Sequence, residues 1–175
     1  MKKRLAILAL IALSGLVFVV LFSVKKQEPE KKVFLEKGER APAFTLTDME
    51  GRVVSLEELV GGSPLYIIFW SSSCVSCKDG MEVLEKAYRK YGKKGFRLVG
   101  VNIYQSAEEV RRFVKDVGIT FNVLLDKEGT SVDKYNIYFV PVSYIISADG
   151  KVLDVYAGNP TEEDLEKVVE RYWQQ

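Results

Sequence analysis

Cys74 and Cys77 are the only cysteines in this chain of 175 residues, and the chain contains no histidine. They lie in the stretch YIIFWSSSCVSCK (residues 66–78), where an apolar run gives way to a helical pattern. A Cys-x-x-Cys pair serves as part of a zinc site, a structural disulfide, a pair of inert buried thiols or a redox-active dithiol. Without histidine, Cys-His and Ser-His catalytic pairs are excluded, as are imidazole ligands for a metal or a haem.

Three of these four uses fit the chain poorly. A structural zinc ion normally takes four ligands, and one cysteine pair supplies only half of them, so we expect no metal. A disulfide across so short a loop stabilises a protein by only about 2 kcal/mol in the loop-entropy model. Inert buried thiols are hard to reconcile with the polar neighbours of the pair, which are Ser71, Ser72, Ser73, Ser76, Lys78 and Asp79.

A redox-active dithiol fits the position of the pair. The helical pattern predicts a helix from about Val75 to Tyr91, which places Cys74 at its N-cap. The unpaired N–H groups and the positive dipole end of a helix N-terminus stabilise a thiolate, which is the form that attacks disulfides. Cys77 lies one turn further on, where its thiol can resolve a mixed disulfide formed by Cys74.

The elements around the pair follow a βαβ order. Apolar, β-rich runs predict buried strands at 64–70 and 96–103, on either side of the helix that follows Cys74. We also expect two short strands in 43–56, a strand in 121–126, a short helical stretch near 130–135 and a hairpin in 141–158.

Three further helices are indicated by the residues that precede them. Ser55 with Glu58, and Ser106 with Glu109, have the spacing of a capping box. Thr161 begins a last helix, with Asp164 in its first turn, that ends near Trp173. The whole order predicts an α/β fold with a mixed central sheet flanked by helices.

The N-terminal segment predicts a single transmembrane helix. Leu5–Val24 is an uncharged apolar run of about 20 residues, long enough to span roughly 30 Å of bilayer core. A cleaved signal peptide is the alternative, and the length of the run and the lack of an Ala-x-Ala site count against it. We expect residues 1–4 in the cytoplasm, 5–24 in the membrane, 25–37 as a polar linker and 38–175 as an extracytoplasmic domain.

Charge excludes one class of partner. The chain has 25 basic and 24 acidic residues, without the concentrated basic face of a nucleic-acid-binding protein, so we expect no nucleic acid to bind.

From about Gly38 to Trp173 the chain resembles the membrane-anchored thioredoxin-like proteins of the TlpA/ResA type. The matching pieces are GERAPAFTLTDMEGRVVSLEEL, YIIFWSSSCVSCK, RLVGVNIYQSAEEVRRFVKDVGITFNVLLD and YNIYFVPVSYIISADGKV. The first piece is shared with peroxiredoxin relatives. The resemblance implies a thioredoxin-like fold and exported thiol–disulfide exchange without a cofactor, such as reduction of the haem-binding cysteines of apocytochrome c. It also implies electrons from a membrane thiol reductase of the CcdA or DsbD type.

The resemblance also implies a substrate groove. Pro141 stands immediately before a predicted strand, where thioredoxin-like folds have a cis proline. Val140 would then offer backbone groups to the substrate, and Trp70 would help to shape the groove or else pack in the core.

The chain departs from the family pattern around the cysteines. Ser73 and Ser76 stand where tryptophan and proline are common, Gly80 stands in place of an active-site glutamate, and Ile68 in place of the buried aspartate of thioredoxin. We therefore expect proton transfer to use substitutes, for which Asp79 and Glu82 are the candidates.

Three functions follow from these residues. The leading hypothesis is a thiol–disulfide oxidoreductase, as a reductase or as a disulfide donor, because the sequence does not reveal the direction of exchange. A peroxiredoxin-like peroxidase is the second, and Ser71 fits its pattern whereas Ile67 stands where it needs proline. A Cu(I) carrier is the third, although copper-binding relatives of this fold also use a histidine.

Overall fold

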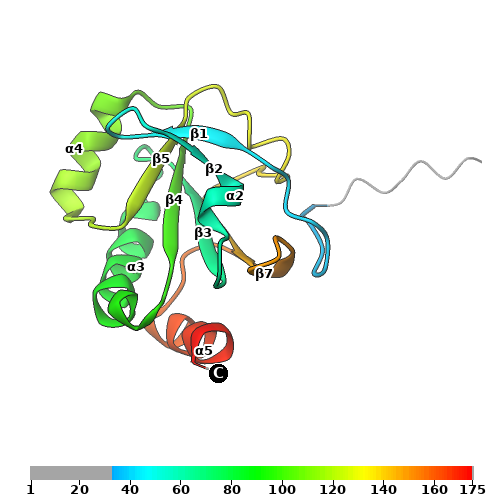
Figure 1. Cartoon of the computed structure of the whole chain (residues 1–175). Helices are drawn as coiled ribbons and strands as arrows, with labels where there is room; N and C mark the ends of the chain where they lie inside the picture. Colours follow the sequence, from blue (N-terminus) through cyan, green and yellow to red (C-terminus); the bar gives the residue numbers. More distant parts are fainter. Residues whose placement is uncertain (1–32, 175) are drawn as a thin grey trace, which may run out of the picture. The chain divides into compact units, whose positions relative to one another are not determined.

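The structure, a computed structural model, describes residues 33–174 and is built around a seven-stranded sheet (Figure 1). The strands lie in the order β2-β1-β5-β4-β3-β6-β7. Strand β4 is parallel to both β3 and β5, whereas β1 and β6 run antiparallel to the strands they join, so the sheet is mixed as predicted. The strands are β1 (Thr45–Asp48), β2 (Val53–Ser55), β3 (Leu65–Trp70), β4 (Leu98–Ile103), β5 (Asn122–Asp126), β6 (Val142–Ile146) and β7 (Val152–Ala157).

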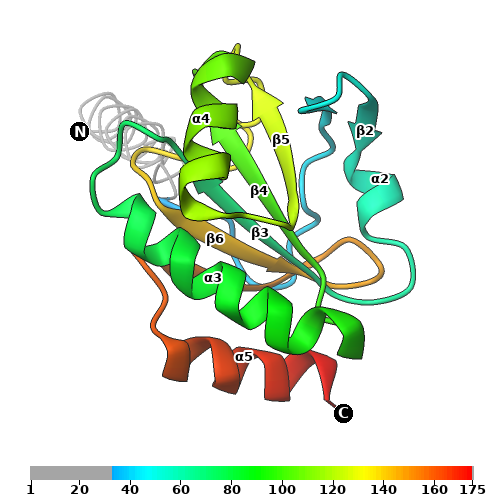
Figure 2. The same cartoon turned by 90° about the vertical axis from the view of Figure 1, so that its left-hand side faces the viewer.

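Three long helices pack on one face of the sheet. They are α3 (Cys77–Tyr91), α4 (Ala107–Val117) and α5 (Glu162–Trp173), and a 3-10 turn, η1 (Gly92–Lys94), follows α3. Figure 2 shows α3 and α5 side by side. The opposite face is covered by the short helix α2 (Leu56–Leu59) and by Val132, Tyr135 and Ile137 of the segment before β6. Helices therefore flank both faces, as predicted.

Strand β3 separates two hydrophobic clusters, because successive side chains of a strand point to opposite faces. Tyr66, Ile68 and Trp70 join the cluster under α3, α4 and α5. The intervening residues of β3 join the cluster on the α2 side. All six residues of β3 are buried, so the strand that leads to the cysteines is held on both faces.

Two predicted elements differ from the structure. Helix α3 begins at Cys77 rather than near Val75, because residues 74–77 form a tight turn in which the N–H of Cys77 donates to the carbonyl oxygen of Cys74 at 3.1 Å. The stretch 130–135 consists of successive turns rather than a helix. Its first backbone N–H groups bond to the carboxylate of Asp126, which competes with helix formation.

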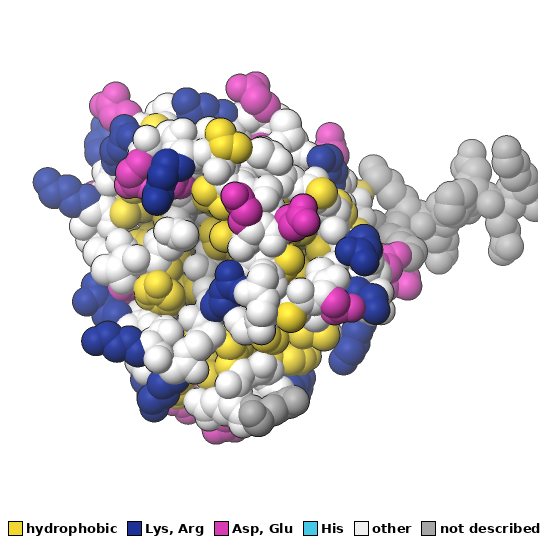
Figure 3. Space-filling view, viewed as in Figure 1, with side chains coloured by type: hydrophobic (Ala, Val, Ile, Leu, Met, Phe, Trp, Pro, Cys, Tyr) yellow, Lys and Arg dark blue, Asp and Glu magenta, His cyan; other side chains and the backbone are white. Residues whose placement is uncertain are grey.

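The predictions for residues 1–4 and 5–24, and for most of 25–37, lie outside the described residues. Within residues 33–174, no helix has both the length and the apolar character needed to cross a bilayer. Packing of the domain begins before Gly38, because Phe34 and Leu35 are half-buried against the cluster on the α2 side. On the face drawn in Figure 3, acidic and basic side chains are interspersed.

Candidate active site

The two cysteines form a disulfide at the carboxyl end of β3, in the turn that leads into α3. Their Cα atoms are 5.3 Å apart. Cys74 is half-buried, whereas Cys77 is only 1% exposed. A partner molecule can therefore reach the sulfur of Cys74 and not that of Cys77, which agrees with the predicted roles of attacking and resolving thiol.

A backbone donor points at the reachable sulfur. The N–H of Cys77 lies 3.2 Å from Sγ of Cys74, and the hydroxyl oxygen of Ser76 lies 3.5 Å from the same sulfur. The N-cap of α3 is Ser76, whose side chain makes no capping hydrogen bond. The N–H of Cys77 is thus the backbone donor that the structure places at this sulfur, and such a donor stabilises a thiolate after reduction.

The segment before β6 brings a second piece of backbone to the disulfide. The peptide bond between Val140 and Pro141 is cis, which confirms the expectation for this proline. The carbonyl oxygen of Val140 lies 3.8 Å from Sγ of Cys74. Strand β6 pairs with β3 so that Phe69 lies opposite Val142, and this pairing fixes Val140 beside the cysteine turn.

A polar network behind Cys74 was missed by the sequence reasoning. Oε1 of Gln105 accepts from the backbone N–H of Ser72 at 2.6 Å and from Nδ2 of Asn102 at 2.9 Å. Nε2 of Gln105 donates to the hydroxyl of Ser72 at 2.7 Å. Asn102, fully buried at the end of β4, is the signal that could have found it, because an amide in an apolar strand needs a partner.

Trp70 does not shape a substrate groove, and that prediction is wrong. Its side chain is 0% exposed and stacks on Phe113 of α4, with ring centroids 4.8 Å apart. The alternation of β3 places it on the core face, so the packing alternative holds.

The two predicted proton-transfer residues, Asp79 and Glu82, are exposed on the first turns of α3. Away from the site, toward the amino end and the middle of β3, burial raises the pKa of Tyr66 above its usual range and that of Tyr144 to about 12. Both phenols therefore stay neutral.

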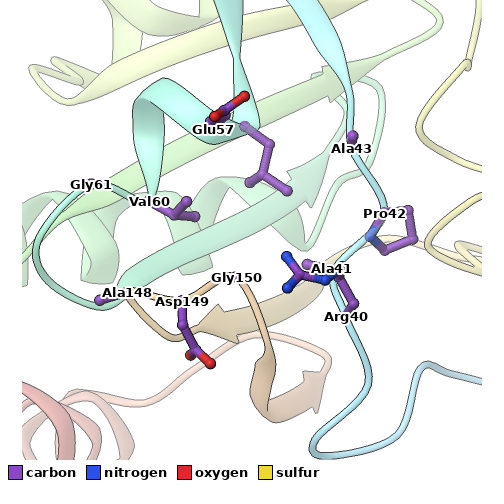
Figure 4. Close-up of a pocket in the computed structure, with 11 residues that line it drawn as sticks. Arg40, Ala41, Pro42, Ala43, Glu57, Val60, Gly61, Ala148, Asp149 and Gly150 are labelled. Carbon is purple, nitrogen blue, oxygen red and sulfur yellow. The ribbon is translucent and has the colours of Figure 1, made fainter.

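A separate pocket of about 720 Å³ lies at the other end of the sheet (Figure 4). It is lined by residues 40–43, by α2 and by the turn between β6 and β7, and Figure 4 shows Arg40 and Asp149 at its rim. Because β6 runs from the disulfide toward this turn, the pocket takes no part in the cysteine chemistry. Among residues 33–174, no three metal-binding side chains come together.

Comparison with known proteins supports the same chemistry. Residues 37–155 match the model of the AhpC/TSA family. The chain is 31% identical to the thiol-disulfide oxidoreductase ResA of Bacillus cereus (strain ATCC 10987 / NRS 248), covering 97% of each chain. It is 32% identical to the thioredoxin-like protein YneN of Bacillus subtilis (strain 168), covering 95% of this chain and 96% of that one.

A solved structure agrees with these sequence relatives. The thioredoxin domain of a thiol-disulfide oxidoreductase from Bacteroides vulgatus superposes with a TM-score of 0.69 at 27% identity, covering 78% of this chain and 97% of that domain. The resemblance to the TlpA/ResA type is confirmed. The chain therefore belongs to the AhpC/TSA family and has the thioredoxin-like fold and the Cys-x-x-Cys pair of a thiol–disulfide oxidoreductase.

Proposed function

We propose that the protein is an extracytoplasmic reductase of protein disulfides, held at the cell membrane by residues 5–24, with apocytochrome c as its substrate. The observation that carries the exchange chemistry is the unequal exposure of the two cysteines beside the Val140 carbonyl. The substrate and the membrane anchor are supported by the TlpA/ResA resemblance and by the apolar run near the N-terminus.

The exchange proceeds in two steps. The Cys74 thiolate attacks one sulfur of the substrate disulfide, which forms a mixed disulfide and releases the other substrate sulfur as a thiolate. The Cys77 thiolate then attacks the Cys74 sulfur, which releases the second substrate thiolate and leaves the disulfide seen in the structure. Two electrons pass to the substrate, and the protons lost by the two cysteines end on the two substrate thiols. Asp79 and Glu82 are the groups proposed to take the proton of Cys77 and release it to water, from which the second substrate thiolate is protonated.

The surface around Cys74 supports a polypeptide as the substrate. Val75 is 93% exposed between the two cysteines, and Phe139, just before Val140, is 49% exposed. Apolar side chains in these positions can cover the residues on either side of a substrate cysteine. The carbonyl of Val140 is placed to accept a backbone hydrogen bond from the same segment.

The experiment that tests the reaction uses a disulfide-bonded peptide with the Cys-x-x-Cys-His motif of apocytochrome c. The reduced protein should reduce it, and Cys77→Ala should accumulate a mixed disulfide through Cys74, seen by intact-mass analysis. Cys74→Ala is the control and should accumulate none. Trapping through Cys77 alone would contradict the assigned roles.

The reduction potential of the Cys74–Cys77 couple decides the direction of exchange, and a value near or below roughly −270 mV is expected of a reductase. A value near roughly −120 mV would instead make it a disulfide donor.

The location is tested by fractionation of cells. The full chain should stay with the membranes after carbonate washing, and a chain beginning at residue 33 should not. Protease added to spheroplasts should digest the domain from outside. A domain protected until lysis would contradict the extracytoplasmic location. In cells that lack a membrane thiol reductase of the CcdA or DsbD type, which we propose as the electron donor, Cys74 and Cys77 should accumulate as the disulfide.

A further inference from the structure

Asn159, in the segment between β7 and α5, bonds to the middle of the cysteine turn. Its Nδ2 donates to the carbonyl oxygen of Ser76 at 2.5 Å, although the two residues are 83 positions apart. Figure 2 shows the segment that leads into α5 passing beside the start of α3.

The space that Asn159 fills exists because residue 80 is glycine. A Cβ atom built on Gly80 would meet the Asn159 side chain, with Cγ at 2.9 Å and Cβ at 3.3 Å. Gly80 is buried in the first turn of α3 and has no unusual backbone angle. Glycine inside a helix costs about 0.5–1 kcal/mol relative to alanine, so local conformation does not favour it here. The close approach of Asn159 does account for it.

The peptide group between Ser76 and Cys77 contacts Asn159 through its carbonyl and the sulfur of Cys74 through its N–H. The carbonyl of Ser76 and the N–H of Cys77 belong to one planar amide. The carbonyl accepts from Asn159, and the N–H is shared between Sγ of Cys74 at 3.2 Å and the carbonyl oxygen of Cys74 at 3.1 Å. Hydrogen bonds that share a peptide group polarise one another, so a donor on the carbonyl strengthens the donation by the N–H.

We propose that Asn159 is a positioning residue for the dithiol, which holds and polarises the Ser76–Cys77 peptide so that its N–H stabilises the Cys74 thiolate. This inference concerns the chain's own thiol and does not depend on which protein is reduced. The amide of Asn159 cannot accept or lose a proton, so it acts through geometry and polarisation alone.

Other charged and titratable groups near the turn come from two elements. Helix α3 carries Lys78, Asp79 and Glu82, and the segment before β6 carries Tyr138. The segment of Gly158, Asn159 and Pro160 brings no charge, and Gln105 and the three serines before Cys74 are neutral. Variants at Asn159 and Gly80 leave all of these groups in place, so a change in thiolate content reports the peptide contact.

The test measures the pH dependence of alkylation of Cys74 by iodoacetamide in a reduced Cys77→Ala background, where Cys74 is the one remaining thiol. Asn159→Ala should lower the thiolate content at a pH below the midpoint by roughly two- to fourfold, as expected when a coupled hydrogen bond is lost. The amide proton at position 77 should move upfield in the NMR spectrum. Asn122→Ala removes an exposed asparagine from the opposite end of the sheet and should change neither measurement.

A second variant breaks the same contact without touching Asn159. Gly80→Ala should push the amide away and produce the same shift, while alanine favours the helix and protects the fold. The double variant should be no worse than either single one, because both remove one interaction. An unchanged alkylation profile in Asn159→Ala, or additive shifts in the double variant, would overturn the proposal even if the protein proves to be a reductase.

Discussion

The carboxylate of Asp126, at the end of β5, is 1% exposed and organises the segment that leads to Val140. It accepts from the backbone N–H groups of Thr130 at 2.7 Å and of Ser131 at 2.8 Å, and from both hydroxyls of these residues. Ser131 is fully buried, so its N–H and hydroxyl have no access to water if the carboxylate is removed.

Asp126→Ala should therefore lower the free energy of unfolding by about 3 kcal/mol, because it leaves two buried donors of Ser131 without a partner. Urea denaturation followed by circular dichroism measures the loss. Asp133→Ala, in the same segment but exposed, is the matched control and should change stability by less than about 0.5 kcal/mol. A loss in Asp126→Ala as small as that of the control would show that the buried carboxylate is dispensable.

Residue type alone revealed part of the site. Cys74, Cys77 and Pro141 were found because few other uses fit their spacing and their neighbours. Gln105 and Asn159 were not found, because their backbone partners, Ser72 and Ser76, lie more than 30 and 80 positions away in sequence. Asn102 was the local sign of the first contact, whereas Asn159 has none. Only the folded chain shows which backbone group it meets.

At the scale of elements, local residue patterns predict where three of the helices begin. The spacings at Ser55, Ser106 and Thr161 each form a capping box, at the starts of α2, α4 and α5. Each box needs only two residues three positions apart, so sequence suffices to predict it. Helix α3 has no such side chain, and its start was placed two residues early. The turn that displaces it depends on Cys74, Ser76 and their distant contacts.

Glu109 provides a pH-dependent test of one box. Hydrogen bonds from the hydroxyl and the backbone N–H of Ser106 lower the pKa of Glu109 below its usual 4.5. Because the folded state holds the lower pKa, the stabilisation is complete above pH 4.5 and is lost as the pH falls through the folded value. Glu109→Gln should thus be less stable than the natural chain at pH 7, and the difference should vanish toward pH 3.

Thermal unfolding between pH 3 and pH 7 measures this difference. Glu108→Gln removes a carboxylate from the same turn without breaking the box, so it reports the effect of that charge on the helix dipole and on Arg112, which lies 3.9 Å from it. If both variants follow the same curve, the hydrogen bonds of the box contribute nothing beyond that charge.

At the scale of the whole molecule, the order of the elements predicted the mixed sheet but not its detail. A βαβ unit constrains β3 and β4 to be parallel neighbours, as found. The insertion of β5 between β4 and β1 depends on pairings between distant strands, which no local pattern records. The cover on the α2 side is mostly irregular chain, because Asp126 draws the backbone after β5 into turns.

Val140 is half-buried and packs against both hydrophobic clusters, which the sheet otherwise keeps apart. Its carbonyl oxygen is also the backbone atom beside Cys74. Loosening of the α2 side, whether by pressure, heat or a distant core substitution, should therefore shift the Val140 carbonyl relative to Cys74. We therefore expect the rate of disulfide exchange at Cys74 to depend on how tightly the cluster on the α2 side is packed.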